Sequence, residues 1–153
     1  MLINRFPMFY FNRMQHRVAH EILEDSEAFD IRFLNTDMAE SETWLAIETS
    51  LGYQIGSARD ELPDRYHVTA KMLRKAPKLL AVCTHGAGYD TVDVDACTEA
   101  GVIVCNQAGQ NREAVAEHAL GMMISLGKKI YEADRRMRGD RDWDRNQFMG
   151  QDI

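Results

Sequence analysis

Short apolar runs alternate with amphipathic stretches along the first two thirds of the chain. The clearest run, residues 79–83, is five residues long and carries no charge, which is typical of a buried strand in a parallel sheet. The stretches between such runs have the spacing of helices. This alternation predicts the order β-α-β-α-β-α-β-α-β, and hence an α/β fold with helices on both faces of a parallel sheet.

The same pattern places the expected elements. Strands are expected at residues 2–6, 31–34, 53–56, 79–83 and 102–105, and helices at 9–24, 40–50, 69–75 and 93–100. Residues 60–67 are polar and contain Pro63, so we expect a loop there. Thr69 and Asp93 are suited to cap their helices, and Gly101 fits the left-handed position just past a helix end.

The last third of the chain has a different pattern, because residues 111–138 form one uninterrupted helical stretch. Asn111 is a natural N-cap, and Glu113 lies in the first turn, where the helix dipole favours an acid. At about 1.5 Å per residue the helix would span roughly 40 Å, more than one small sheet can cover. Its apolar positions at spacings of three and four are Val115, Ala119, Met122, Met123, Leu126, Ile130, Ala133 and Met137. We expect this apolar stripe to be an association surface, with Trp143 as an anchor.

Composition narrows the classes of function. The formal net charge of −6 comes without a basic stripe, so nucleic acid is not an expected partner. No apolar run approaches about 20 residues, and the first residues lack a signal-peptide core, so neither membrane insertion nor secretion is expected. The three cysteines show no CxxC spacing, and Cys83 and Cys105 lie in apolar runs, where small buried hydrophobes are expected. This cysteine usage indicates the reducing cytoplasm.

Two glycines follow the apolar run at 79–83, and they are the first candidate for a ligand site. Ligands of open α/β sheets bind at the carboxyl ends of strands, and Gly86 and Gly88 let backbone N–H groups converge on a small anion. A dinucleotide fingerprint would need a third glycine at position 91, which holds Thr91. These residues alone leave two interpretations open: an anion-binding loop, or a strand-to-helix turn that happens to use two glycines.

Histidines are the remaining chemical candidates. His16 and His20 are four residues apart on an expected helix, a spacing that suits zinc, but no third ligand stands nearby. His118 is expected to be a packed or capping residue, and His85 either contacts a ligand or points to solvent. No Ser/His/Asp or Cys/His nucleophile arrangement is present, so no catalytic residue and no metal ligand is assigned.

Three segments in order, residues 85–93, 100–106 and 115–121, resemble the NAD-dependent D-2-hydroxyacid dehydrogenases, with the phosphoglycerate dehydrogenase-like branch nearest. The resemblance implies a two-lobed enzyme in which a Rossmann lobe is inserted into a flavodoxin-like substrate lobe. Residues 1–105 would form the substrate-binding lobe. Residues 106–153 would form the crossing segment, the long helix and the start of the cofactor lobe. It also implies a small 2-hydroxy or 2-keto acid as substrate and a homodimer through residues 111–145.

The resemblance further implies which residues bind. Substrate would contact Ser57, Thr84, His85, Gly86, Ala87, Gly88 and Asn111, and the cofactor would contact Ala87 and Arg112. NAD or NADP is expected in the complete enzyme. None is expected on this chain, because in the family the catalytic residues and the glycine fingerprint follow the part that these 153 residues match. Two positions depart from the family pattern. Thr84 stands where many phosphoglycerate-type members have arginine, and Arg112 stands where a small hydroxyl residue is common.

Two alternatives come from other classes of protein. A receiver-like signalling domain would have acidic residues after the first strand and an aspartate after the third, where this chain has Asn4-Arg5 and Gly56-Ser57. The second alternative is a non-catalytic, dimerising regulatory module that has the fold of the substrate lobe but no enzymatic activity. The sequence does not exclude it.

Overall fold

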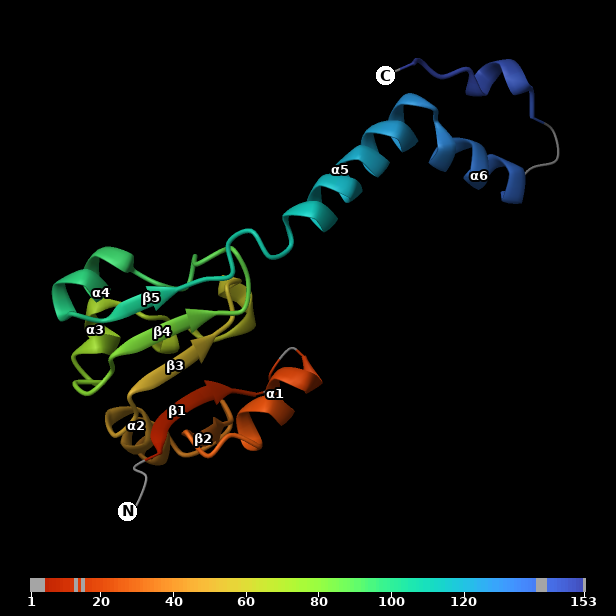
Figure 1. Ribbon diagram of the computed structural model, residues 1–153. Helices are drawn as coiled ribbons and strands as arrows, with labels where there is room; N and C mark the ends of the chain where they lie inside the picture. Colours follow the sequence, from red (N-terminus) through yellow and green to blue (C-terminus); the bar gives the residue numbers. More distant parts are fainter. Residues whose placement is uncertain (1–4, 13, 15, 140–142, 153) are drawn as a thin grey trace. The chain divides into compact units, whose positions relative to one another are not determined.

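The computed structural model describes residues 5–12, 14, 16–139 and 143–152. It divides into two compact units, Met1–Gly109 and Gln110–Ile153 (Figure 1). The sequence places a functional boundary between residues 105 and 106, and the assignment of the two parts to substrate and cofactor lobes stays a prediction.

A five-stranded parallel sheet forms the first unit, in the strand order β2-β1-β3-β4-β5. The strands are β1 (Phe6–Phe11), β2 (Phe29–Leu34), β3 (Gly52–Ile55), β4 (Ala81–Thr84) and β5 (Ile103–Cys105). Their register aligns Phe9, Tyr53, Val82 and Val104 in one row across the sheet. All four pairings are parallel, which confirms the α/β prediction.

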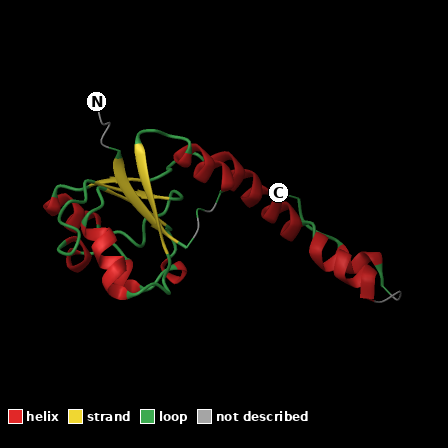
Figure 2. Cartoon of the chain, turned by 90° about the horizontal axis from the view of Figure 1, so that it is seen from below, coloured by secondary structure: helices red, strands yellow, loops and turns green. Residues whose placement is uncertain are grey.

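Helices cover both faces of this sheet, but unequally (Figure 2). They are α1 (Arg17–Glu24), α2 (Glu40–Glu48), α3 (Ala70–Leu73) and α4 (Val94–Ala100), with 3₁₀ turns η1 (Arg59–Glu61) and η2 (Asp64–Tyr66). The main core joins the Phe9–Tyr53–Val82 row to Ile47 of α2, Met72 of α3 and Cys97 of α4. On the opposite face α1 contacts β2, and the Tyr10 hydroxyl is 2.9 Å from His20 Nδ1.

Capping residues lie at the helix boundaries that the sequence predicts. The Thr69 side chain accepts a hydrogen bond from the Met72 N–H at the start of α3. Asp93 accepts one from Ala96 N–H at the start of α4, and Gly101 has a φ of 73° at its end. These local predictions are confirmed, because a cap needs only a short polar side chain or a glycine at the right position.

The amino-terminal predictions were wrong. A strand at 2–6 and a helix at 9–24 were expected, whereas β1 covers Phe6–Phe11 and the helix begins at Arg17. Residues 2–4 lie outside the described part. β1 is an inner strand buried on both faces, so it has a continuous apolar run instead of an alternating one. In the sequence, this apolar run continues into residues with helical spacing, so the two were read together as one helix. In the structure, residues 6–11 are a strand because they are buried in the sheet.

The second unit contains α5 (Arg112–Gly127), α6 (Ile130–Gly139) and η3 (Arg145–Phe148). The expected uninterrupted helix is therefore wrong, since it breaks at Lys129, whose φ is 53°. The segment after η3 returns to this break: Gln151 N–H donates to Gly127 O at 2.8 Å, and Lys129 Nζ donates to Gln147 O at 3.1 Å. Asn111 occupies the N-cap position of α5, but its side chain makes no capping hydrogen bond, contrary to expectation.

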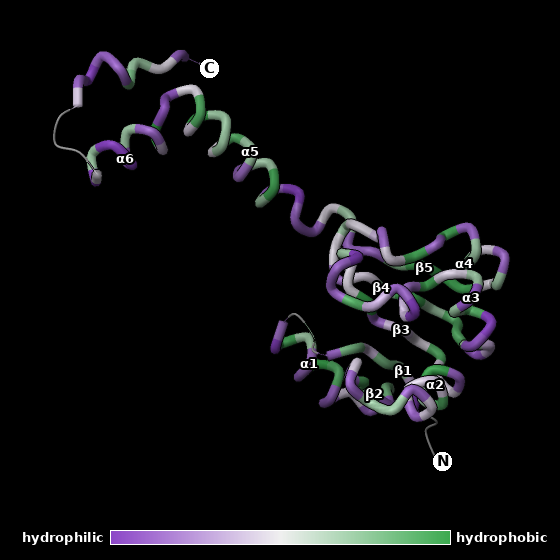
Figure 3. The backbone as a smooth tube through the Cα atoms, turned by 180° about the vertical axis from the view of Figure 1, so that it is seen from behind, coloured by the Kyte–Doolittle hydropathy of each residue, from purple (hydrophilic) through white to green (hydrophobic). Residues whose placement is uncertain are grey.

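Apolar residues predominate in the carboxyl-terminal part of α5 and lie on several sides of the helix (Figure 3). Its exposed apolar residues are Val115, Leu120, Met122, Met123, Ile124 and Leu126. None of the residues of α5 is buried in the described structure. Helices with this much apolar surface usually pack against other protein, so the expected association surface stays a prediction.

Two further observations concern the chain as a whole. Of the helices in the described residues, none combines the length and apolar character that crossing a membrane requires. The cysteines are free thiols, with Cys97 buried, Cys83 half-buried and Cys105 exposed. The expectation of a small buried hydrophobe is therefore wrong for Cys105, which is exposed on the edge strand β5.

Candidate functional site

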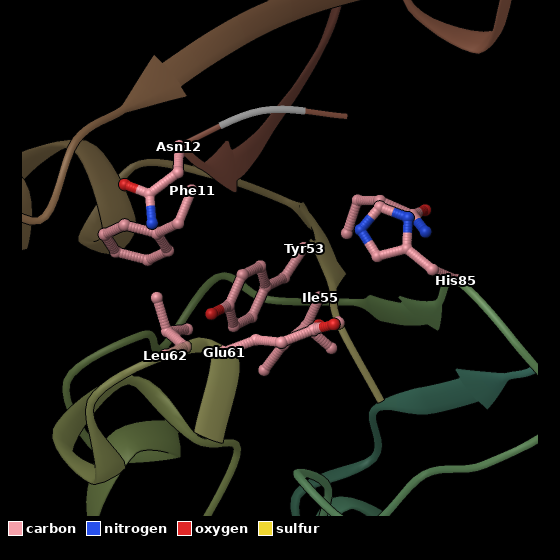
Figure 4. Close-up of a pocket in the computed structure, with 9 residues that line it drawn as sticks. Phe11, Asn12, Tyr53, Ile55, Glu61, Leu62 and His85 are labelled. Atoms are coloured by element: carbon pink, nitrogen blue, oxygen red, sulfur yellow. The ribbon is translucent and has the colours of Figure 1, made fainter. Parts of the chain in front are cut away.

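The carboxyl ends of β1, β3 and β4 meet at one edge of the sheet, where a cavity of about 240 Å³ opens. Its lining comes from the β1 end (Phe11, Asn12), from β3 and its end (Tyr53, Gln54, Ile55, Gly56), from the following loop (Glu61, Leu62), and from His85 after β4. Figure 4 shows the Glu61 side chain beside those of Tyr53 and Ile55. This is the edge at which parallel sheets bind ligands.

The glycine loop that follows β4 has its carbonyl groups engaged. Gly86 O accepts hydrogen bonds from Gln107 N–H at 2.9 Å and from the Thr84 hydroxyl at 3.0 Å. Ala87 O accepts one from Asn106 Nδ2 at 2.8 Å. By contrast, no described residue accepts a hydrogen bond from the N–H groups of residues 86–88. Three successive donors are therefore available to a ligand, an arrangement that suits a small anion.

Contacts with the end of β3 fix the loop in place. His85 N–H donates to Ile55 O at 3.1 Å, and the buried Thr91 hydroxyl donates to Gly56 O at 2.7 Å. Thr91 occupies the position that a third glycine would take in a dinucleotide fingerprint. Its hydroxyl instead ties the loop to the neighbouring strand, which holds the free N–H groups in a defined position.

Ser57 lies directly against the two glycines. A Cβ atom added to Gly88 would lie 3.4 Å from Ser57 Cβ, and one added to Gly86 would lie 3.5 Å from Ser57 Oγ. The structure therefore brings together Ser57, Gly86 and Gly88, which the sequence placed in one site. Thr84 is 1% exposed, and its hydroxyl is directed to Gly86 O, so it supports the loop from inside the protein.

His85 lines the cavity, and its contact with a ligand stays a prediction. Burial lowers the pKa of its imidazole, and the negative charge of Glu61 opposes that shift. The pKa therefore lies below the ordinary value of about 6.5, and the ring is mostly uncharged at neutral pH.

Two predicted site residues lie in the second unit. Asn111 begins α5, and the exposed Arg112 guanidinium is 3.7 Å from a Glu113 carboxylate oxygen. Their grouping with the glycine loop, and the contact of Ala87 and Arg112 with a cofactor, stay predictions.

Sequence reasoning missed Asn12 and Glu61. Asn12 was hidden because β1 was placed too early, so the residue after its carboxyl end fell inside an expected helix. Glu61 was assigned to a featureless loop, yet its carboxylate occupies the space that a side chain at Gly56 would need. The glycine at the end of β3 was the available signal, because it permits this close approach.

The histidines outside the cavity have structural surroundings. His16 Nδ1 accepts a hydrogen bond from Val18 N–H at the start of α1, and His20 Nε2 is 3.1 Å from Glu24. Within the described residues, no group of three or more His, Cys, Asp or Glu side chains is placed to hold a metal ion. His118 is exposed, so the expectation that it packs is wrong in this unit.

The chain matches a known protein family. Residues 9–140 match the family described as D-isomer specific 2-hydroxyacid dehydrogenase, catalytic domain. The chain belongs to this family. The resemblance carried by the three sequence segments is thereby confirmed, and the chain corresponds to the amino-terminal part of these dehydrogenases.

The relatives match different shares of this chain, and the chain matches only part of each relative. A D-3-phosphoglycerate dehydrogenase of Mycobacterium leprae is 43% identical over 86 residues, which are 56% of this chain and 16% of that protein. The chain thus spans about a sixth of the length of such curated relatives. A 2-hydroxyacid dehydrogenase from Ketogulonicigenium vulgare Y25 superposes with a TM-score of 0.74 at 17% identity, over 97% of this chain and 44% of that one.

A further solved structure, D-lactate dehydrogenase from Aquifex aeolicus complexed with NAD and lactic acid, gives a TM-score of 0.69 at 20% identity. That match covers 95% of this chain and 41% of the Aquifex chain. At these identities the superpositions establish the shared fold.

Proposed function

We propose that this chain is the substrate-binding part of an oxidoreductase that transfers a hydride between a nicotinamide cofactor and a small D-2-hydroxy acid. One observation carries the proposal: within the described part of the chain the N–H groups of residues 86–88 have no acceptor, while the carbonyls of Gly86 and Ala87 are engaged. We infer that this loop holds the carboxylate of the substrate. The free thiols of the chain support a cytoplasmic location.

The chain's own contribution to the reaction is binding and orientation. A 2-keto acid held by its carboxylate presents its carbonyl carbon in a fixed direction, and such positioning is a large part of catalysis. The nicotinamide, when bound, supplies the hydride. The sequence contains no GxGxxG followed by a helix, so these residues do not fit the pyrophosphate of NAD. We assign to this chain only a wall of the cofactor site, at Ala87 and Arg112.

The substrate is proposed to be an unphosphorylated acid such as glyoxylate or hydroxypyruvate. Thr84 is uncharged and turned inward, and Glu61 adds a negative charge to the cavity. Phosphohydroxypyruvate is the competing substrate, because the Mycobacterium leprae relative is a D-3-phosphoglycerate dehydrogenase.

A kinetic comparison of these acids tests the proposal. In a polypeptide that joins this chain to a cofactor-binding lobe, kcat/KM for hydroxypyruvate should exceed that for phosphohydroxypyruvate by about tenfold or more. A missing charge-assisted hydrogen bond to the phosphate accounts for a difference of that size. Arg112 could supply the cation for a phosphate that Thr84 does not supply. The Arg112→Ser variant is the matched control for this possibility. A preference for the phosphorylated acid, abolished by this substitution, would contradict the proposed substrate class.

We propose in addition that the second unit forms a two-fold homodimer through residues 111–145. The support is the α5 surface, where Leu126 is 79% exposed and Met123 51% exposed. Trp143 lies beyond α6, with its ring 6.1 Å from that of Phe148.

Light scattering tests this assembly. The chain should be dimeric, and Leu126→Glu should shift it toward monomer because a buried unpaired carboxylate destabilises an apolar interface. Glu117→Gln, on the same helix, is the control and should leave the mass unchanged. A strictly monomeric wild-type chain at high protein concentration would contradict the dimer.

A further inference from the structure

Two of the three cysteines lie side by side in the sheet. Cys83 of β4 pairs in register with Cys105 of β5. Their neighbours Val82 and Val104 also pair in register and pack in or against the main core. Because side chains alternate along a strand, both cysteines point to the opposite face. Cys105 is exposed and Cys83 is half-buried, so reagents reach the pair from solvent.

The spacing of this pair suits a bond between the two sulfur atoms. Hydrogen-bonded strands lie about 4.8 Å apart. Cα atoms joined by a disulfide are usually about 4.4–6.8 Å apart. The register therefore places both thiols within reach of each other without a change in strand pairing, whereas Cys97 lies in α4 within the main core.

The two thiols differ in their surroundings. Burial raises the pKa of Cys83, and the neighbouring Cys105 raises that pKa further through its charge and a hydrogen bond. The raised pKa disfavours ionisation of Cys83, and Cys105 is the more accessible sulfur. The more accessible thiol is suited to react first with an oxidant, and the less accessible one to attack the resulting sulfenic acid. Redox-sensitive cysteine pairs have this arrangement.

We propose that Cys83 and Cys105 form a two-thiol modification site that hydrogen peroxide converts to a reversible disulfide. Cys105 loses its proton to solvent, its sulfur attacks one peroxide oxygen, the O–O bond breaks, and a sulfenic acid and a hydroxide form. The hydroxide takes up the proton that Cys105 released and becomes the first water. The Cys83 sulfur then attacks the Cys105 sulfur. The S–O bond breaks, and the released hydroxide takes the Cys83 proton to give a second water. Two thiols are oxidised by two electrons in total, and one peroxide is reduced to two waters.

The position of the pair links it to the glycine loop. Cys83 immediately precedes Thr84, and Cys105 immediately precedes Asn106, whose side chain holds Ala87 O. The disulfide would therefore join the two segments from which the loop and its support arise. The proposal itself rests on the sheet register and is independent of the proposed dehydrogenase function.

Mass spectrometry of the whole chain tests this inference. After treatment with hydrogen peroxide, the wild-type chain should lose about 2 Da, the mass of two hydrogens, and proteolytic fragments should join Cys83 to Cys105. Dithiothreitol should restore the original mass. The Cys97→Ser variant is the matched control and should form the same cross-link.

Single variants separate the steps. Cys83→Ser should stop at a Cys105 sulfenic acid, which dimedone traps, and Cys105→Ser should form no internal cross-link. The fragment map of the wild-type chain requires no substitution and decides the question even if a variant misfolds. Sulfenic or sulfinic acid without the cross-link, disulfides only between chains, or two thiols that stay reduced would each overturn the proposal.

Discussion

A Gly88→Val substitution is expected to raise the KM for the 2-keto acid about tenfold or more, since one misplaced oxyanion donor costs a few kcal/mol. The enzyme measured is a polypeptide that joins this chain to a cofactor-binding lobe. A Cβ atom at position 88 already lies 3.4 Å from Ser57 Cβ, and the two methyl groups of valine extend beyond it. The loop must then move, and its N–H groups lose their alignment with the carboxylate. Steady-state kinetics with glyoxylate and hydroxypyruvate measure the effect.

Two controls distinguish a local effect from general damage to the fold. Gly88→Ala adds only the atom at 3.4 Å, an ordinary van der Waals contact, and should raise KM much less. Ser57→Gly removes the obstacle, so in a Ser57→Gly background the further substitution Gly88→Val should raise KM less than it does in the wild-type background. If a folded Gly88→Val enzyme keeps its KM and kcat, the glycine loop does not hold the substrate.

The second large expectation is that this 153-residue chain has no dehydrogenase activity by itself. Hydride transfer needs a bound nicotinamide, a cation that polarises the carbonyl, and a proton donor of suitable pKa. The chain offers an anchor for the carboxylate, but its sequence has no GxGxxG followed by a long helix. His85, the histidine at the cavity, has its pKa lowered by burial and is mostly neutral at neutral pH. The purified chain should bind NADH weakly or not at all and should reduce neither glyoxylate nor hydroxypyruvate.

Absorbance of NADH measures this directly, and a cofactor-binding lobe added in the same polypeptide should create the activity. Sustained NADH oxidation by the chain alone would contradict the division of labour proposed here. So would an inactive joined polypeptide that binds the cofactor normally, and that result would favour the non-catalytic regulatory module.

The sheet could be predicted because its signals are local. The apolar run of β4 carries no charge. The Asp93 side chain caps the start of α4, and Gly101, which has no side chain, takes the left-handed conformation at its end. β1 was misplaced because a strand buried on both faces has no alternation to distinguish it from a helix. The break at Lys129 depends on the returning segment, whose Gln151 bonds to Gly127, and such a long-range contact leaves no pattern in the helix itself.

The site was predictable in part for the same reason. Glycines at a strand end indicate a loop that admits an anion, and the family resemblance added Ser57. The arrangement of the loop depends on Asn106 and Gln107, which engage its carbonyls from the end of another strand. Glu61 reaches the cavity only because η1 folds back over Gly56. These arrangements come from the meeting of distant segments, which one sequence does not reveal.

The central claim is that the N–H groups of the glycine loop hold a carboxylate, and amide NMR of the isotope-labelled chain tests it most directly. Oxalate is a suitable probe because it is a planar, unreactive mimic of a 2-keto acid, with sodium chloride at matched ionic strength as the control. We predict saturable shifts concentrated at the amides of Gly86, Ala87 and Gly88, and their loss in Gly88→Val. Amides of this loop that do not respond to oxalate, or that respond equally to chloride, would contradict the account.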